Sequence, residues 1–343
     1  MKKICFFLSV LLLSFFSVYG QVINIKIANI APERSPWDIE LKKMAQEWNK
    51  ITNGKVRLTF INAVTLGDET GVIKKITSVR PGQKSPLQGG VFSPPGIHSL
   101  APDAGIYTLS VPFLIRSQEE LDLVLDKFGG KIKDAIRKAG YEVITWSNVG
   151  WLSFYTTSPV NSLADLKKLR IASAGLDNNV LHQAFAACGF RTMSVTSDKL
   201  AQSLQSKDGV QGFYSVPMYA YAMGFTKYIT DVIDAKICPV VAALLISNDT
   251  WNSVPEEFKP ALLESVENTK ERLNASLEQS DRTYLQNMEK EGVRLKKLDA
   301  EELAVWAGDF QKDVEALTKS VDVFDVELLN EINQYLTEYR KSR

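Results

Sequence analysis

The side chains that most often carry catalysis are scarce in this sequence and poorly spaced for it. The chain has two histidines, His98 and His182, and neither has a second histidine or a cysteine at metal-site spacing. It also lacks a Gly-x-Ser-x-Gly turn, a glycine-rich phosphate loop before a helix, and a His-Glu-x-x-His motif. Each histidine is therefore interpreted as a surface or packed residue. No metal or cofactor is expected, and a binding protein is favoured over an enzyme.

Two other kinds of reactive side chain leave alternatives open. Asp68 and Glu69 are adjacent carboxylates that could contact a ligand or form a solvated turn, and neither interpretation is favoured in a chain with 40 acidic residues. An enzyme that used these two acids stays a minority hypothesis. Cys188 and Cys238 could form a disulfide outside the cytoplasm. Their apolar sequence surroundings favour buried free thiols instead.

The elements that would position a site alternate between strand and helix. Residues 22–30 and 56–60 alternate apolar and polar side chains, as strands do, and apolar residues between 37 and 51 recur at helical spacing. Ser35 and Pro36 fit the start of that helix. The order strand, helix, strand predicts an α/β sheet with crossover helices.

The rest of the chain continues this pattern and ends in long helices. Further helices are expected at residues 118–127, 131–138 and 178–188, further strands at residues 142–146, 170–173 and 240–247, and a loop at residues 80–96. After Pro260 a single helix is predicted up to about Gly292. At about 1.5 Å per residue it would be roughly 45 Å long, more than the width of one small domain. Asp299 and Glu302 are spaced to cap another helix.

The N-terminal residues predict export. Lys2 and Lys3 precede an apolar run at residues 4–18, and the small residue Gly20 precedes Gln21. This is the layout of a secretory signal peptide cleaved after Gly20, so residues 1–20 are assigned to one. An uncleaved anchor helix stays open, although the apolar run is shorter than the ~20 residues of a bilayer span.

The charge balance argues against a nucleic-acid partner. The chain has 40 basic and 40 acidic residues, and no basic cluster is interleaved with aromatic side chains. Removal of Lys2 and Lys3 with a signal peptide leaves 38 basic residues against the same 40 acidic ones.

Six short segments, in order along the chain, resemble the solute-binding proteins of tripartite ATP-independent periplasmic (TRAP) transporters, the DctP-like family. They are APERSPW at residues 31–37, LGDE at 66–69, VPFLIRS at 111–117 followed by EE at 119–120, PV at 159–160 with DLKKLRI at 165–171, LQ at 204–205 through VQG at 210–212, and WNSVP at 251–255. Each segment alone is a weak signal, but their order and spacing over about residues 22–300 are specific.

The resemblance implies a class II-like periplasmic-binding-protein fold of two α/β domains that close on a ligand by a hinge motion. The first domain is expected at residues 21–147 plus 236–255, and the second at residues 148–235 plus about 293–343. The long helix at about residues 256–292 would span both. The resemblance also implies a periplasmic location, a membrane permease driven by an ion gradient as partner, and in some systems a tetratricopeptide-repeat lipoprotein.

The sequence departs from the family pattern where relatives bind carboxylates. Relatives place arginines at the positions that Ala172 and Leu152 occupy here, and a guanidinium binds a carboxylate through two parallel hydrogen bonds. Phe213 and Tyr214 stand where the family usually has polar residues. Arg170, on the same strand face as Ala172, could supply a displaced cation.

These departures predict a small, largely hydrophobic ligand with one small polar end. A carboxylate without an ion partner would pay a large desolvation cost in such a site. The expected ligand-binding residues are Ile30, Glu69, Phe92, Ser93, Asn148, Trp151, Leu152, Ala172, Phe213, Tyr214 and Ser215. Two alternatives stay open: a lipid-like ligand carried for a partner other than a TRAP permease, and a carboxylate bound by a displaced cation.

Overall fold

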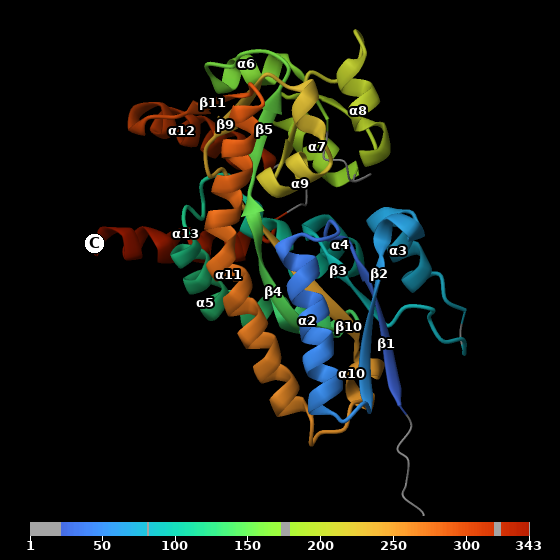
Figure 1. The fold of residues 1–343 in the computed structure, drawn as a ribbon. Helices are drawn as coiled ribbons and strands as arrows, with labels where there is room; N and C mark the ends of the chain where they lie inside the picture. Colours follow the sequence, from blue (N-terminus) through green and yellow to red (C-terminus); the bar gives the residue numbers. More distant parts are fainter. Residues whose placement is uncertain (1–21, 81, 173–178, 319–323, 343) are drawn as a thin grey trace, which may run out of the picture.

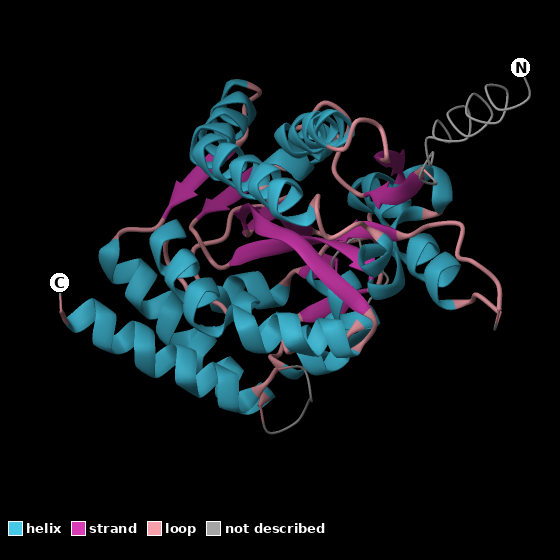
Figure 2. Ribbon diagram, turned by 90° about the horizontal axis from the view of Figure 1, so that it is seen from below, coloured by secondary structure: helices cyan, strands magenta, loops and turns pink. Residues whose placement is uncertain are grey.

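A computed structural model describes residues 22–80, 82–172, 179–318 and 324–342, and it contains two β-sheets with helices packed around them (Figures 1 and 2). The expected two-domain α/β class is confirmed. The signal peptide predicted at residues 1–20 lies outside the described residues. Within the described ranges, no helix is both long and apolar enough to cross a membrane.

The first sheet has the strand order β2-β1-β3-β10-β4. Its strands are β1 (Ile23–Asn29), β2 (Val56–Asn62), β3 (Gly89–Phe92), β4 (Tyr141–Trp151) and β10 (Pro239–Ser247). Strand β1 pairs in parallel with β2 and β3, whereas β10 runs antiparallel to β3 and β4. One face packs on α2 (Pro36–Ile51), α10 (Asn248–Ser253) and α11 (Lys259–Lys290), and the other on α3 (Asp68–Thr77), α4 (Pro94–Leu100), α5 (Gln118–Lys138) and α13 (Val326–Lys341).

The second sheet has the strand order β11-β9-β5-β8-β6-β7. Its strands are β5 (Ser153–Thr156), β6 (Arg170–Ala172), β7 (Arg191–Met193), β8 (Gly212–Ser215), β9 (Asp231–Asp234) and β11 (Arg294–Lys297). The helices packed around it are α6 (Leu163–Lys168), α7 (Asn179–Ala187), α8 (Ser197–Gln205), α9 (Pro217–Ala222) and α12 (Ala300–Leu317). Short 3₁₀ helices lie at Ala63–Leu66, Pro102–Ala104, Ile106–Ser110 and Phe225–Tyr228.

The chain crosses between the two sheets along adjacent paths. Strand β4 passes into β5 at Leu152, and β9 returns to β10 through residues 235–238. The two paths are hydrogen-bonded to each other, because the Leu152 N–H donates to the Cys238 carbonyl at 2.9 Å and the Ile237 N–H donates to the Leu152 carbonyl at 3.3 Å. Helix α11 runs beside this crossing and contacts α2 and β4 in the first domain and α9 and β11 in the second (Figure 1).

The predicted helix starts and the long helix are confirmed. The Ser35 side chain accepts the Asp38 N–H at the start of α2, and Asp299 and Glu302 form a capping box on α12. The helix expected from Pro260 to about Gly292 is α11. Its Leu262, Val266 and Leu273 are buried against the first sheet.

Two local expectations are wrong. Residues 80–96, expected to be a loop, contain β3 and the start of α4. The absence of a side chain at Gly89 allows β3 to pair closely with β10, because a Cβ there would be 2.0 Å from the Leu245 carbonyl oxygen. The two helices expected between residues 118 and 138 are one continuous helix, α5. Glycines weaken helices, but burial of the apolar face of α5 stabilises the helix across Gly129 and Gly130.

The C-terminal helix also departs from the expected domain division. Helix α12 packs on the second sheet through Trp306 and Phe310. Helix α13, assigned to the second domain with it, instead buries Leu328 and Ile332 in the first domain's core beside α5. The Arg340 guanidinium fixes it there with a 2.6 Å ion pair to Glu120.

Candidate ligand-binding cavity

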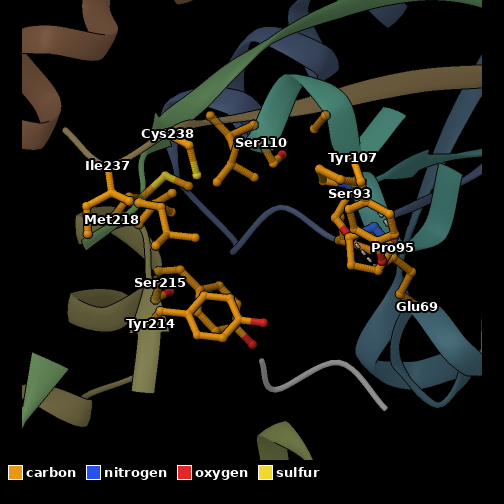
Figure 3. Close-up of a pocket in the computed structure, with 18 of the residues that line it drawn as sticks. Glu69, Ser93, Pro95, Tyr107, Ser110, Tyr214, Ser215, Met218, Ile237 and Cys238 are labelled. Atoms are coloured by element: carbon orange, nitrogen blue, oxygen red, sulfur yellow. Dashed lines mark hydrogen bonds between the residues drawn. The ribbon is translucent and has the colours of Figure 1, made fainter. Parts of the chain in front are cut away.

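A cavity of about 700 Å³ lies between the two domains and is lined by residues from both. Figure 3 shows Glu69, Ser93 and Tyr107 on one side of it and Tyr214, Met218, Ile237 and Cys238 on the other. Its volume falls in the range of ~300–1,000 Å³ that is usual for small-molecule sites, which are commonly found at domain interfaces.

The first domain contributes a polar corner built around Glu69. Glu69 lies in the first turn of α3, and Ser93 lies between β3 and α4. The Ser93 backbone N–H donates to Glu69 Oε1 at 2.7 Å, and the Ser93 hydroxyl donates to Oε2 at 2.6 Å. The Glu69 side chain is held in one orientation by these two bonds.

Burial dominates the electrostatics of this corner. It raises the pKa of Glu69 to about 7, and the two hydrogen bonds from Ser93 only partly oppose the shift. Burial, together with the Glu69 charge, also raises the pKa of Tyr107. Near neutral pH the Glu69 carboxyl can therefore either donate a proton to a ligand or accept a hydrogen bond from one.

The second domain contributes an aromatic wall of four residues, Phe154, Phe185, Phe190 and Tyr214. The rings of Phe185 and Tyr214 are stacked with centroids 4.7 Å apart, and Phe154 and Phe190 are stacked at 6.1 Å. Phe154 lies at the centre and contacts the other three rings. Such rings offer a rigid apolar surface to a ligand.

The domain crossing forms a third part of the lining. Leu152, Ile237 and Cys238 come from the two crossing paths. Cys188 and Cys238 are both free thiols, as expected from their surroundings. Burial raises the pKa of Cys188 to about 11 and that of Cys238 to about 12, so neither is a reactive thiolate near neutral pH.

The cavity has acidic side chains but, among the described residues that line it, no lysine or arginine. The Asp313 carboxylate forms an ion pair with Lys167, whose Nζ lies 2.6 Å from Asp313 Oδ2 and which does not line the cavity. Asp68 and Asp198 approach each other from the two domains, and burial and the charge of Asp198 raise the pKa of Asp68. The field of the described lining therefore disfavours an anionic ligand.

Six of the eleven residues predicted to bind the ligand line this cavity. They are Ile30, Glu69, Ser93, Leu152, Tyr214 and Ser215. Leu152, at a position where an arginine was expected, presents an aliphatic side chain to the cavity.

The other five predicted residues are placed in the protein core. Phe92 and Ala172 are fully buried, and Phe213 stacks on Tyr155 at 4.9 Å. The Asn148 Oδ1 accepts the N–H groups of residues 150 and 240, so its side chain holds the crossing strands. Trp151 is buried in the core of the first domain.

Arg170 does not supply the displaced cation considered above. Its Nε donates to the Gly209 carbonyl at 2.6 Å and its Nη2 to the Lys207 carbonyl at 3.0 Å, so the guanidinium is bound to a neighbouring loop. It is absent from the cavity lining.

Sequence reasoning missed most of the aromatic wall. Phe185 lies on α7 and Phe190 just after it, where the sequence predicted only a helix at residues 178–188. Tyr107 and Phe310 were also missed, since they come from distant segments. No group of three or more histidine, cysteine, aspartate or glutamate residues within the described ranges could hold a metal ion.

Two α/β domains that enclose a cavity at their crossing strands define the class of two-domain solute-binding proteins. The family model "Bacterial extracellular solute-binding protein, family 7" (DctP) matches residues 27–320, and the chain belongs to this family. The resemblance to TRAP solute-binding proteins predicted from the sequence is confirmed.

Relatives of known identity agree with this assignment. A solute-binding protein of Roseobacter denitrificans is 22% identical over 280 residues, which cover 79% of this chain and 81% of the relative. A TRAP periplasmic solute binding protein from Desulfovibrio salexigens with bound orotic acid has a TM-score of 0.79 at 19% identity, covering 93% of this chain and 99% of that one. The sugar acid binding protein of Advenella mimigardefordensis in complex with galactonate has a TM-score of 0.79 at 16% identity with the same coverage. At these identities the solved structures establish the fold alone.

Proposed function

We propose that the chain is the periplasmic receptor of a TRAP transporter, which captures a small, largely apolar ligand between its domains and delivers it to an ion-gradient-driven permease. Export by a cleavable signal peptide at residues 1–20 is part of this proposal. A receptor of this kind performs no chemistry on its ligand, in keeping with the sparse catalytic motifs of the sequence. Association with a tetratricopeptide-repeat lipoprotein stays a prediction.

The observation that carries the ligand class is the lining of the cavity. It combines the aromatic wall with aliphatic side chains at the crossing, and its described residues include no lysine or arginine. Burial of apolar ligand surface contributes about 25 cal/mol per Å². A carboxylate would lose its hydration there without gaining an ion partner.

The polar corner orients the proposed ligand. Glu69 and Ser93 lie across the cavity from Tyr214 of the aromatic wall (Figure 3). A ligand with a single hydroxyl, amine or amide end can bind there and extend its apolar body towards Phe154 and Phe185. This arrangement favours an amphiphilic molecule with one small polar end.

An organic acid is the second candidate ligand. Two of the structural relatives carry orotic acid and galactonate. The observation that favours this candidate here is Glu69, whose pKa of about 7 lets its protonated carboxyl donate a hydrogen bond to a carboxylate. Such binding would weaken as the pH rises above 7, whereas binding of a hydrogen-bond donor would strengthen.

The test combines identification of the natural ligand with a matched binding panel. Native mass spectrometry of protein purified from bacterial periplasm is expected to find an apolar or amphiphilic small molecule. In solution, N-phenyl-1-naphthylamine, a neutral aromatic probe that fluoresces in apolar surroundings, is expected to bind, while succinate, orotate and galactonate leave it in place. Recovery of a tightly bound organic acid, or its displacement of the probe at micromolar concentration, would reject the apolar ligand and leave the receptor assignment intact.

A further inference from the structure

Asp281 connects the long helix to the strand that crosses between the domains. It lies on α11, and its Oδ2 accepts the backbone N–H of Trp151 at 3.3 Å. Trp151 is the last residue of β4, and β5 begins at Ser153. Asp281 as a residue is only 8% exposed, so this contact between the helix and the crossing strand is shielded from solvent.

A second contact on the same helix fixes the first domain's side of the crossing. Two turns before Asp281, the Asn274 side chain accepts the Ser147 hydroxyl at 2.6 Å. Gly150 lies between these two attachment points with a φ of 147°, which side chains rarely tolerate. A rotation of the second domain about Gly150 would therefore leave the Asn274 contact in place and alter the surroundings of Asp281.

Two buried polar atoms at this crossing lack a hydrogen-bond partner. They are Asp281 Oδ1 on α11 and the Tyr155 hydroxyl on β5, and neither has a partner within the described residues. Tyr155 is fully buried, and the nearby Asp281 charge adds to burial in raising its pKa. An unsatisfied buried polar group costs about 1–3 kcal/mol, so a conformation that joins the two would be stabilised.

Few other titratable groups face Asp281. Lys236 opposes the effect of burial on Asp281, and Asp234 acts on Tyr155 from the end of β9. The small cavity of about 10 Å³ beside Asp281 is lined from α2, β4, α9 and α11, and its described lining adds no further titratable side chain. Burial raises the pKa of Asp281 to about 7.

We propose that Asp281 is a positioning residue of the domain hinge: when it loses its proton, its free oxygen accepts the Tyr155 hydroxyl in a second arrangement of the domains. The proton on Asp281 thereby selects between two degrees of closure. This inference rests on the proposed receptor function, since it requires domains that move about a hinge, but it does not depend on the class of ligand.

The direction of the effect follows from the pKa. In the observed arrangement the carboxyl is buried without a full set of donors, so this arrangement binds the proton more tightly than one with the Tyr155 hydrogen bond. The observed arrangement is therefore favoured below pH 7 and loses population as the pH rises through about 7.

The experiment measures the distance between the domains without any ligand. Nitroxide labels are placed at exposed Lys75→Cys on α3 and Lys199→Cys on α8, while the native thiols stay unlabelled because their pKa values are raised to about 11 and 12. Double electron–electron resonance between pH 5.5 and 8.5 is expected to show two distance populations. Their ratio should change about tenfold or more, with a midpoint near pH 7.

Three variants test the assignment. Asp281→Asn, which keeps an acceptor for the Trp151 N–H, is expected to hold the low-pH distribution at every pH. Tyr155→Phe is expected to raise the midpoint, because the ionised carboxyl loses its donor. Glu69→Gln is the matched control, since its carboxyl has the same pKa of about 7 but lies on the cavity wall, and the transition should persist.

A transition that persists in Asp281→Asn, disappears in Glu69→Gln, or is absent from the wild-type protein would overturn the proposal. An unchanged midpoint in Tyr155→Phe would remove Tyr155 as the partner. None of these results depends on whether the ligand is apolar, so failure here is distinguishable from failure of the proposed function.

Discussion

The two sides of the cavity are built on different physical principles. On the first domain, Glu69 and Ser93 form a small polar corner whose geometry is fixed by two hydrogen bonds. On the second domain, Phe154, Phe185 and Tyr214 form a wall held by ring packing. The polar corner can set orientation and pH dependence, whereas the aromatic wall supplies contact area.

The two sides of the cavity should therefore contribute differently to stability, ligand affinity and pH dependence. Apolar burial scales with area and is insensitive to pH, so the aromatic wall should dominate affinity and domain stability. Hydrogen bonds to a buried carboxyl contribute less net energy but depend on its protonation. Changes to the aromatic wall should therefore produce larger effects than changes to the polar corner.

The largest effect is expected from Phe154→Ala. Phe154 is 1% exposed and touches three other rings, so its truncation leaves a void at the centre of the aromatic wall. The free energy of unfolding should fall by about 4 kcal/mol in urea denaturation. Val64→Ala, on the exposed rim of the first domain, is the control and should change it by less than about 0.5 kcal/mol. Equal losses in both variants would contradict the comparison.

The next effect concerns ligand class and is expected from Leu152→Arg. A guanidinium at this position would enter the apolar cavity near the crossing. Affinity for N-phenyl-1-naphthylamine should fall about 100-fold, close to 3 kcal/mol, while binding of succinate or galactonate should appear in calorimetry. Leu152→Met, which nearly conserves volume, should keep probe binding within about tenfold. Organic-acid binding that is already strong in the wild type and unchanged by the arginine would exclude the role given to Leu152.

Leu152 and Ala172 show which part of the site could be predicted from the sequence. The departure of Leu152 from the family pattern was visible along the chain, and the structure places Leu152 in the cavity. Ala172 departs in the same way but is buried in the core. The sequence shows that an arginine is missing at both positions. Only the packing of the two domains decides which of the two side chains faces the cavity.

Two neighbouring residues on β8 show the same limit of prediction from sequence. Phe213 and Tyr214 were both expected at the site, and adjacent residues on β8 must point to opposite faces. Tyr214 lines the cavity, while Phe213 stacks on Tyr155 inside the second domain. Periodicity predicted the long helix α11 and its cap-bearing neighbour well, because those signals are local. Phe185, Phe190 and α13 were missed or misplaced because their partners are distant in sequence.

A smaller effect, confined to pH dependence, is expected from Glu69→Gln. The folded-state pKa of about 7 lies above the ordinary value of 4.5, so the stability that this group contributes is complete at low pH and is lost as the pH rises towards 7. Relative to the wild type, the variant should gain about 2 kcal/mol in unfolding free energy between pH 5 and pH 8. Asp281 adds a similar dependence that the variant should retain.

Urea titrations at several pH values check this prediction. Asp198→Asn serves as the control, because that residue also lines the cavity but is exposed, and an exposed aspartate ionises at about pH 4, well below neutrality. It should leave the pH dependence near neutrality unchanged. If Asp198→Asn flattens the profile and Glu69→Gln does not, the polar corner has been assigned to the wrong carboxyl.

The smallest effect is expected from Ser93→Ala, which removes one of the two donors to Glu69 and keeps the other, the backbone N–H. Both hydrogen bonds lower the pKa of Glu69, because they favour its ionised form, so the variant's carboxyl should titrate above 7. At pH 8 the loss of stability should be about 1 kcal/mol, and it should shrink at pH 5, where the carboxyl is protonated. Carbon-13 NMR of labelled glutamate carboxyls measures the change in the Glu69 pKa directly.

Ser110→Ala is the control, because Ser110 lies in the same cavity but is not bonded to Glu69, and it should leave the Glu69 pKa unchanged. A Glu69 pKa unchanged by Ser93→Ala would mean that burial alone sets the charge of the polar corner, and that its hydrogen bonds only fix its geometry.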